Sequence, residues 1–166
     1  SLTFLASQAG ISGFERPHVY AWWATVTQPM IDDGIDFTPD TLTGNFESLV
    51  VCAQFFRGVS SVSVLGQGSY DTGGAAWDGS GSGFDSPTFS LADTSRLVGA
   101  IAWSGIDNDG RGPSGFVSRA TSFATNKAGG GLGYSGGGVT SAWFDWSPSG
   151  TVDSGGAGIA LEVAGA

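Results

Sequence analysis

Residues 18–26 read HVYAWWATV, and this stretch decides the fold. Aromatic and β-branched residues dominate it, which favours a β-strand over a helix. Because alternate side chains of a strand point to opposite faces, every second residue is expected to face the core. The side chains expected on that buried face are those of Val19, Ala21, Trp23 and Thr25.

Further stretches of the same kind follow along the chain. Residues 48–56 (SLVVCAQFF) and 97–103 (LVGAIAW) are near-continuous apolar runs, which predicts strands that are covered on both faces. Shorter strands are expected at residues 35–38, 87–91, 115–118, 140–147 and 158–163. Loops are expected where glycine, serine and aspartate gather, at residues 66–83, 104–115 and 128–138.

Short strands separated by turns are typical of an antiparallel β-sandwich, because each strand buries one face against a second sheet. No window holds a helical apolar repeat over three turns. We therefore predict an all-β, jelly-roll-like sandwich of about eight strands. No linker or charge run divides the chain, so residues 1–166 are expected to form a single domain, and this length can bury a core without disulfides.

The charge balance narrows the possible partners. Fifteen acidic residues against six basic ones give a formal net charge of -9. Nucleic-acid binding is disfavoured, because holding phosphates needs clustered Lys and Arg. No apolar stretch approaches the ~18 residues of a membrane span, and anionic lipid would repel the chain. Cys52 is the one cysteine, and its apolar surroundings predict a buried small hydrophobe rather than a reactive thiol.

Residues suited to catalysis or metal binding are scarce. His18 is the one histidine, which leaves little from which to build a nucleophilic triad or a zinc site. Asp107 and Asp109 stand in the glycine-rich run DNDG and could present oxygens to Ca²⁺. The run lacks the later acidic ligands of a calcium loop, so an ordinary turn is the alternative. We predict a protein that is not an enzyme, with Ca²⁺ as the only candidate cofactor.

Aromatic residues supply the candidate ligand-binding sites. Asp145 stands between two aromatic residues in a predicted strand, and sugar-binding sandwiches combine ring faces with carboxylates in this way. Trp77 is isolated in a polar loop, so it is expected to contact a ligand, a neighbouring subunit or its own sandwich. The tryptophans in strand-like stretches are instead expected in the core or at an interface. The candidate ligand-binding residues are Trp77, Tyr134, Trp143 and Asp145.

Three stretches read together suggest a family. Residues 20–27 (YAWWATVT), 35–38 (IDFT) and 48–60 (SLVVCAQFFRGVS) follow one another, and the last ends in the step Phe56-Arg57-Gly58-Val59. The order resembles the β-sandwich modules of tailed-phage structural proteins and of some secreted bacterial proteins, and residues 93–102 are similar to a later strand of these modules. Such modules open with an earlier apolar strand. No such strand is evident before residue 18, so it is expected to be shortened or supplied by a neighbour.

The resemblance implies a structural protein at the surface of a phage or phage-like particle, such as a capsid decoration protein, a head fibre or a tail-associated module. Its partners would be other virion proteins or copies of itself, its place the virion surface or the extracellular space, and it brings no catalytic residues. A carbohydrate-binding module that recognises host-cell glycan is the alternative. A glycan-active hydrolase with two carboxylates from distant strands is a third hypothesis.

Overall fold

The computed structural model describes residues 2–10, 17–33, 51–70, 86–92, 94–104, 116–124, 128–143 and 156–165. Strands dominate this part of the chain, every strand pair is antiparallel, and the sheets lie in facing layers, so the prediction of an all-β antiparallel sandwich is confirmed. In chain order the elements are β1 (Thr3–Ala9), β2 (His18–Trp23), α1 (Gln28–Asp33), β3 (Ser61–Tyr70), β4 (Phe89–Ser90), β5 (Arg96–Ser104), β6 (Phe116–Ala124), β7 (Ala128–Ser135), β8 (Ser141–Ala142) and β9 (Gly156–Ala164).

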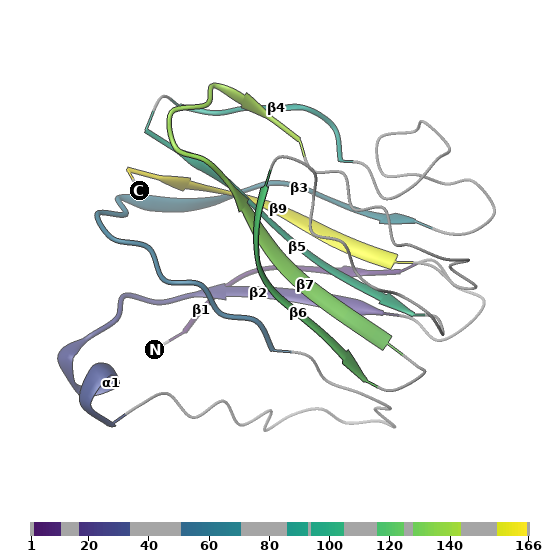
Figure 1. The fold of residues 1–166 in the computed structure, drawn as a ribbon, viewed down its shortest axis with the longest axis horizontal. Coiled ribbons are helices and arrows are strands. Elements are labelled where there is room, and N and C mark those ends of the chain that lie inside the picture. Colours follow the sequence, from purple (N-terminus) through teal and green to yellow (C-terminus); the bar gives the residue numbers. More distant parts are fainter. Residues whose placement is uncertain are drawn as a thin grey trace.

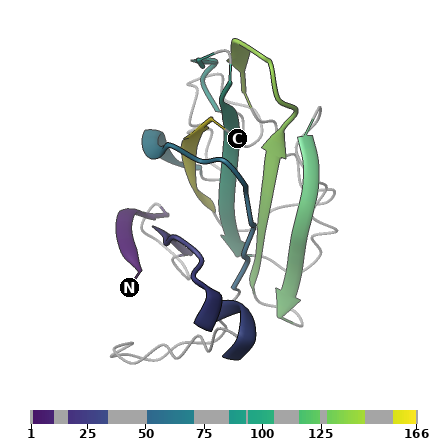
Figure 2. The ribbon, with the colours of Figure 1, turned by 90° about the vertical axis from the view of Figure 1, so that its left-hand side faces the viewer.

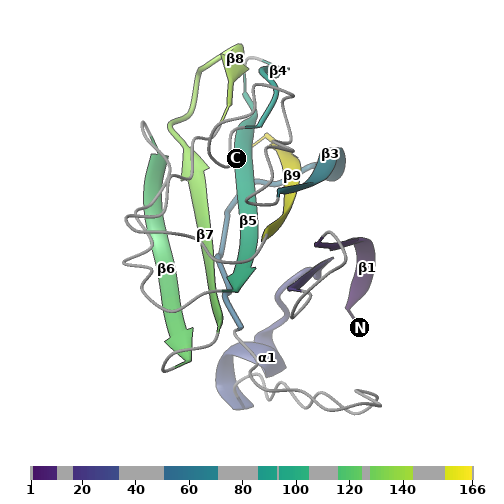
Figure 3. The same cartoon turned by 90° about the vertical axis from the view of Figure 1, so that its right-hand side faces the viewer.

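The architecture centres on a five-stranded sheet with the strand order β3-β9-β5-β7-β6 (Figure 1). The two-stranded sheet of β1 and β2, here called the hairpin layer, lies against one face of this central sheet (Figures 2 and 3). A second small sheet pairs β4 with β8. The chain thus forms a sandwich in which the central sheet is the shared layer.

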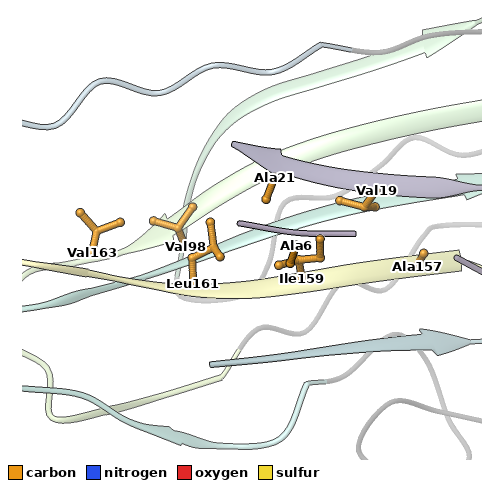
Figure 4. Packing of buried hydrophobic residues seen from close by; sticks show 8 residues of the cluster. All are labelled: Ala6, Val19, Ala21, Val98, Ala157, Ile159, Leu161 and Val163. Carbon is orange, nitrogen blue, oxygen red and sulfur yellow. The ribbon is translucent and has the colours of Figure 1, made fainter. Parts of the chain in front are cut away.

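The hairpin layer packs its small residues onto the central sheet. Ala6, Val19 and Ala21 are buried against alternate residues of β9, including Ile159 and Leu161 (Figure 4). Inward positions of β2 fall at every second residue, as the pleat of a strand requires. The prediction that Val19 and Ala21 face the core is therefore confirmed.

The opposite face of the central sheet has a smaller core. Leu97 and Ile101 of β5 are buried there with Ala160 of β9. Leu91, beside β4, and Ala142 of β8 close over them. Because β5 also buries Val98 on the hairpin side, the prediction of a strand at residues 97–103 that is covered on both faces is confirmed.

One predicted central strand is wrong. Residues 51–56 are not in a strand, and their side chains alternate between exposed and half-buried. The inward residue Phe56 packs on the hairpin-side core, whereas Val51 and Phe55 face solvent. The segment therefore lies extended on the surface, with apolar side chains on both of its faces. Residues 48–50 and the predicted strand at 35–38 lie outside the described residues.

Two predicted loops contain strands instead. Residues 61–70 form β3 and residues 128–135 form β7, although both are rich in glycine or serine. Strand pairing uses backbone groups, so β7, which lies between β5 and β6, needs few large side chains of its own, while β3 pairs along one edge with β9. Leu132 and Tyr134 are the residues by which β7 packs on the hairpin-side core. The remaining residues of these predicted loops, apart from 136–138, lie outside the described part. Of the loop predicted at 104–115, Ser104 ends β5 and residues 105–115 lie outside the described part.

The two ends of the predicted sandwich also differ from expectation. Thr3–Ala9 forms β1 and pairs with β2, so the strand that was not evident before residue 18 is present. Near the other end, residues 140–143 of the strand predicted at 140–147 are described, and of these Ser141–Ala142 form β8, a short pairing with β4. Residues 144–147 lie outside the described residues.

Gly58 sits where the chain bends shortly before β3. Gly58 has φ +74° and Gly165 has φ +75°, a region that favours glycine. A Cβ atom on either residue would lie 3.0 Å from the carbonyl oxygen of the other. Near this contact, the backbone amide of Ser60 donates a 2.9 Å hydrogen bond to the carbonyl of Ala164. The close approach of Gly58 and Gly165 and this hydrogen bond together hold the start of β3 against the end of β9.

Candidate functional site

Aromatic side chains stand in a row on the outer face of the hairpin layer. Because the alternate residues of β2 point into the core, the residues between them point outward. Across the two strands, Phe4 of β1 lies opposite Trp22 of β2 and joins the same face. The members of this aromatic row are Phe4, His18, Tyr20 and Trp22.

The rings of the aromatic row contact one another. The ring centroids of Tyr20 and Trp22 are 5.5 Å apart with 17° between the planes, and those of His18 and Tyr20 are 6.0 Å apart at 14°. Phe4 meets Trp22 edge to face at 6.1 Å. Stacked rings turn their faces to each other, so the Tyr20 ring presents mainly an edge to solvent. Even so, Phe4 is 55% exposed, Tyr20 43% and Trp22 40%.

A lane of small residues runs beside this ridge of rings. On β1, Ser7 lies opposite Tyr20, and Ala9 lies opposite His18. The register shifts between Phe4 and Ala6, where Leu5 packs on the hairpin-side core. The shift sets Phe4 on the outer face at one end of the lane. The outer face of the hairpin layer therefore consists of a ridge on β2 and a shallower lane on β1.

Exposed large apolar side chains concentrate in the first third of the chain. Among the described residues, the exposed large apolar side chains that lie beyond the first third of the chain are Val64 and Trp143. β1 and β2 carry no charged residue, although the whole chain has a net charge of -9. Concentrated apolar exposure of this kind marks interaction surfaces in soluble proteins. The exposed residues within the first third are Leu2, Phe4, Tyr20, Trp22, Val26, Ile31, Val51 and Phe55.

Tyr134, a predicted ligand-binding residue, is held by protein contacts. Its ring meets Phe56 edge to face at 5.4 Å, and the Arg96 guanidinium lies 5.7 Å from its centroid. Arg96 also donates a 3.4 Å hydrogen bond to the carbonyl of Ser135. Through its contact with Phe56, Tyr134 joins residues 51–60 to the central sheet, and ligand binding by Tyr134 stays a prediction.

Trp143 directly follows β8, and its side chain is 55% exposed. It follows Ala142, which packs on the core of the opposite face of the central sheet, whereas Tyr134 packs on the hairpin side. The structure therefore does not bring Trp143 and Tyr134 together. The other predicted site residues lie outside the described part, namely Trp77, Asp107, Asp109 and Asp145.

Chemically reactive groups do not converge in the described ranges. No three His, Cys, Asp or Glu residues of this part are grouped so that they could hold a metal ion. Cys52 is half-buried rather than fully buried as predicted, and burial raises the pKa of its thiol, which disfavours the nucleophilic thiolate. Within the same ranges, no helix has the length and apolar character needed to cross a membrane.

The aromatic row is the feature that sequence reasoning missed. The signal was present in HVYAWW, where small or β-branched residues alternate with aromatic ones. Of the predicted inward residues Val19 and Ala21 are buried, whereas Trp23 is half-buried and Thr25 is exposed beyond the end of β2. The outward set of His18, Tyr20 and Trp22 was not recognised as a surface. Phe4 escaped notice because β1 was not located.

Comparison with known proteins gives no relative for this fold and surface: no family model, curated protein or solved structure matches the chain.

Proposed function

We propose that this protein is a non-catalytic structural module of a phage or phage-like particle, carried in many copies as a capsid decoration, head fibre or tail-associated protein. The observation that carries the proposal is the uncharged, aromatic outer face of the hairpin layer. The resemblance of residues 20–60 to phage sandwich modules supports the same interpretation. The sandwich provides the scaffold, and the outer face provides the contact.

The size of this face suits a component that acts in many copies. Phe4, Tyr20 and Trp22 are about half exposed. Side chains of this kind hold about 150–250 Å² each, so these three offer roughly 300 Å², worth at most about 7 kcal/mol if fully covered. Association of two proteins costs about 4–15 kcal/mol in lost freedom. A single contact of this size is weak, and repetition over a particle makes such contacts effective.

Mass photometry and electron microscopy of the purified chain over a range of concentrations test the proposal. We expect multimers that grow with protein concentration and persist at high salt, because salt screens the repulsion between acidic copies and leaves apolar contacts intact. A chain that stays monomeric at every concentration would overturn it, and turnover of a glycan substrate would favour the hydrolase hypothesis instead. Portal, capsid and tail genes beside its own gene would add support.

A carbohydrate-binding module is the second candidate function, and the exposure of Trp143 favours it. A solvent-facing indole can stack on the apolar face of a pyranose. Trp143 lies on the opposite side of the central sheet from the aromatic row, so one molecule can use both surfaces. Glycan-array binding that is lost in Trp143→Ala and kept in Tyr20→Ala would support this candidate. Equal binding by both variants would count against it.

A further inference from the structure

We propose that the partner of the aromatic row is a second copy of this chain, seated by a two-fold axis that runs parallel to β1 and β2. The inference rests on the proposed function and names the contact that the function would use. In the resulting pair, the ridge of rings on β2 of each copy fills the lane of small residues on β1 of the other.

The distribution of charge favours a second copy over a charged partner. Two molecules of net charge -9 repel each other wherever acidic residues meet. β1 and β2 carry no Asp, Glu, Lys or Arg side chain, and in the proposed pair His18 of one copy is opposite Ala9 of the other, so two copies can meet on this outer face without placing like charges together. A strongly basic partner would gain nothing from contact with this face.

The shape of the outer face of the hairpin layer allows two copies of it to fit together. The ridge consists of His18, Tyr20 and Trp22, and the lane beside it holds Ser7 and Ala9. The two strands of a pair lie about 4.8 Å apart, so ridge and lane are offset by one strand spacing. A surface with a ridge beside a matching lane can close on its own copy, as an isologous interface requires.

The direction of the axis follows from that offset. A two-fold axis that runs along the strands, midway between β1 and β2, places β2 of one copy over β1 of the other. The rotation leaves the height of each residue along the strand direction unchanged. Tyr20 of one copy then faces Ser7 of the other. An in-plane axis across the strands would place ridge on ridge, where the rings collide. With the axis along the strands, ring faces ring only at the end of the lane, where Phe4 of one copy is opposite Trp22 of the other, and not along the whole ridge.

The area involved predicts a weak pair. The rings bring roughly 300 Å² from each copy, so the total falls below the approximately 1,200 Å² of a standard interface. Such a pair forms at high local concentration, as on a particle, and dissociates on dilution.

The test is a complementation experiment by sedimentation velocity with two variants. Ser7→Trp fills the lane and Tyr20→Ser removes the middle of the ridge, and each alone is expected to raise the dimer dissociation constant at least about tenfold. An equimolar mixture is expected to recover a heterodimer, because the indole introduced at position 7 of one variant then faces the shortened side chain at position 20 of the other. Ser141→Trp and Trp143→Ala, which change exposed residues near the opposite face, are the matched controls and should leave dimerisation unchanged.

The outcomes separate the inference from the proposed function. If Ser7→Trp does not fold, as judged by circular dichroism, Ser7→Leu replaces it in the same mixture. Wild-type assembly that persists unchanged in both variants overturns the pairing and leaves the proposed function standing. Weakening in both variants without recovery in the mixture overturns the axis and the fit of ridge into lane. A wild-type chain that is monomeric at all concentrations overturns both.

Discussion

Strands β9 and β2 are both apolar, yet they bury their residues in opposite ways. β9 reads GAGIALEVA and is buried along nearly its whole length, with Ile159 fully excluded from solvent. β2 reads HVYAWW and leaves two of its largest side chains, Tyr20 and Trp22, about half exposed. Position explains the difference, because β9 has a strand on each edge and cores on both faces, whereas β2 belongs to the outer layer.

The comparison shows that side-chain size does not determine burial in this molecule. Small residues let layers approach closely at the centre, where the backbone of neighbouring strands supplies much of the packing. Large rings at the outside of the described part leave apolar surface exposed. Stability should therefore depend on the small-residue centre, and association on the aromatic outside.

The largest effect is expected at the centre. Ile159→Ala should lower the free energy of unfolding by about 2–5 kcal/mol, because it removes a fully buried side chain and leaves a cavity. Urea unfolding measures the change. The matched control is Ile31→Ala, whose side chain is 64% exposed and should change stability by less than about 0.5 kcal/mol. Equal losses of unfolding free energy in Ile159→Ala and Ile31→Ala would contradict the view that stability depends on the buried centre.

A pair of buried serines sharpens the description of the centre. The Ser135 hydroxyl accepts a 2.9 Å hydrogen bond from the Leu97 amide. Ser135→Ala should therefore cost about 1–3 kcal/mol by leaving that buried amide unsatisfied. Ser95 is also fully buried, but its hydroxyl has no hydrogen-bond partner in the described part. Ser95→Ala should be neutral or stabilising in the same chemical-denaturation assay, and a loss there equal to that of Ser135→Ala would be inconsistent with this contrast.

The glycine contact at the edge of the central sheet should have the next largest effect. Gly165→Ala forces an alanine into positive φ and against the carbonyl oxygen of Gly58, so we expect a loss of about 1–2 kcal/mol. Gly136→Ala is the control, because a Cβ there meets nothing within 4 Å. Thermal melting compares the two variants. An unchanged melting temperature for Gly165→Ala would show that the contact between Gly58 and Gly165 does not stabilise the pairing of β3 with β9.

The smallest effect on stability is expected in the aromatic row. Tyr20→Ala removes ring contacts on an exposed face, which are worth about 0.2–1 kcal/mol in a sheet. The loss should be several times smaller than that of Ile159→Ala in the same unfolding experiment. A loss as large as that of the core variant would show that the row holds the fold together rather than serving as a contact surface.

The strands that could be predicted from sequence are those that bury branched side chains. β5 and β9 can be recognised by their Val, Ile and Leu, and β2 by the alternation of Val19 and Ala21 with aromatic residues. β7 could not be predicted this way, because AGGGLGYS has the composition of a turn and its place in the sheet depends on backbone pairing with β6 and β5 rather than on large side chains of its own. Apolar residues at 51–56 predicted a central strand, although only one face of that segment meets the core.

The candidate site was harder to predict than the fold. Aromatic residues in strands were expected in the core or at an interface, and sequence alone does not decide which face of a strand is covered. Ala6, Val19 and Ala21 settle that question for the hairpin layer, because their burial sends the rings outward. Tyr134 was predicted to bind a ligand, but its partners Phe56 and Arg96 come from distant parts of the sequence.

Hydroxyl-radical footprinting at increasing protein concentration tests most directly whether the outer face of the hairpin layer is a contact surface. Phe4, Tyr20 and Trp22 should lose reactivity together as copies associate, while the similarly exposed Trp143 keeps its own. Unchanged oxidation of the three rings at every concentration, or protection confined to Trp143, would contradict the assignment.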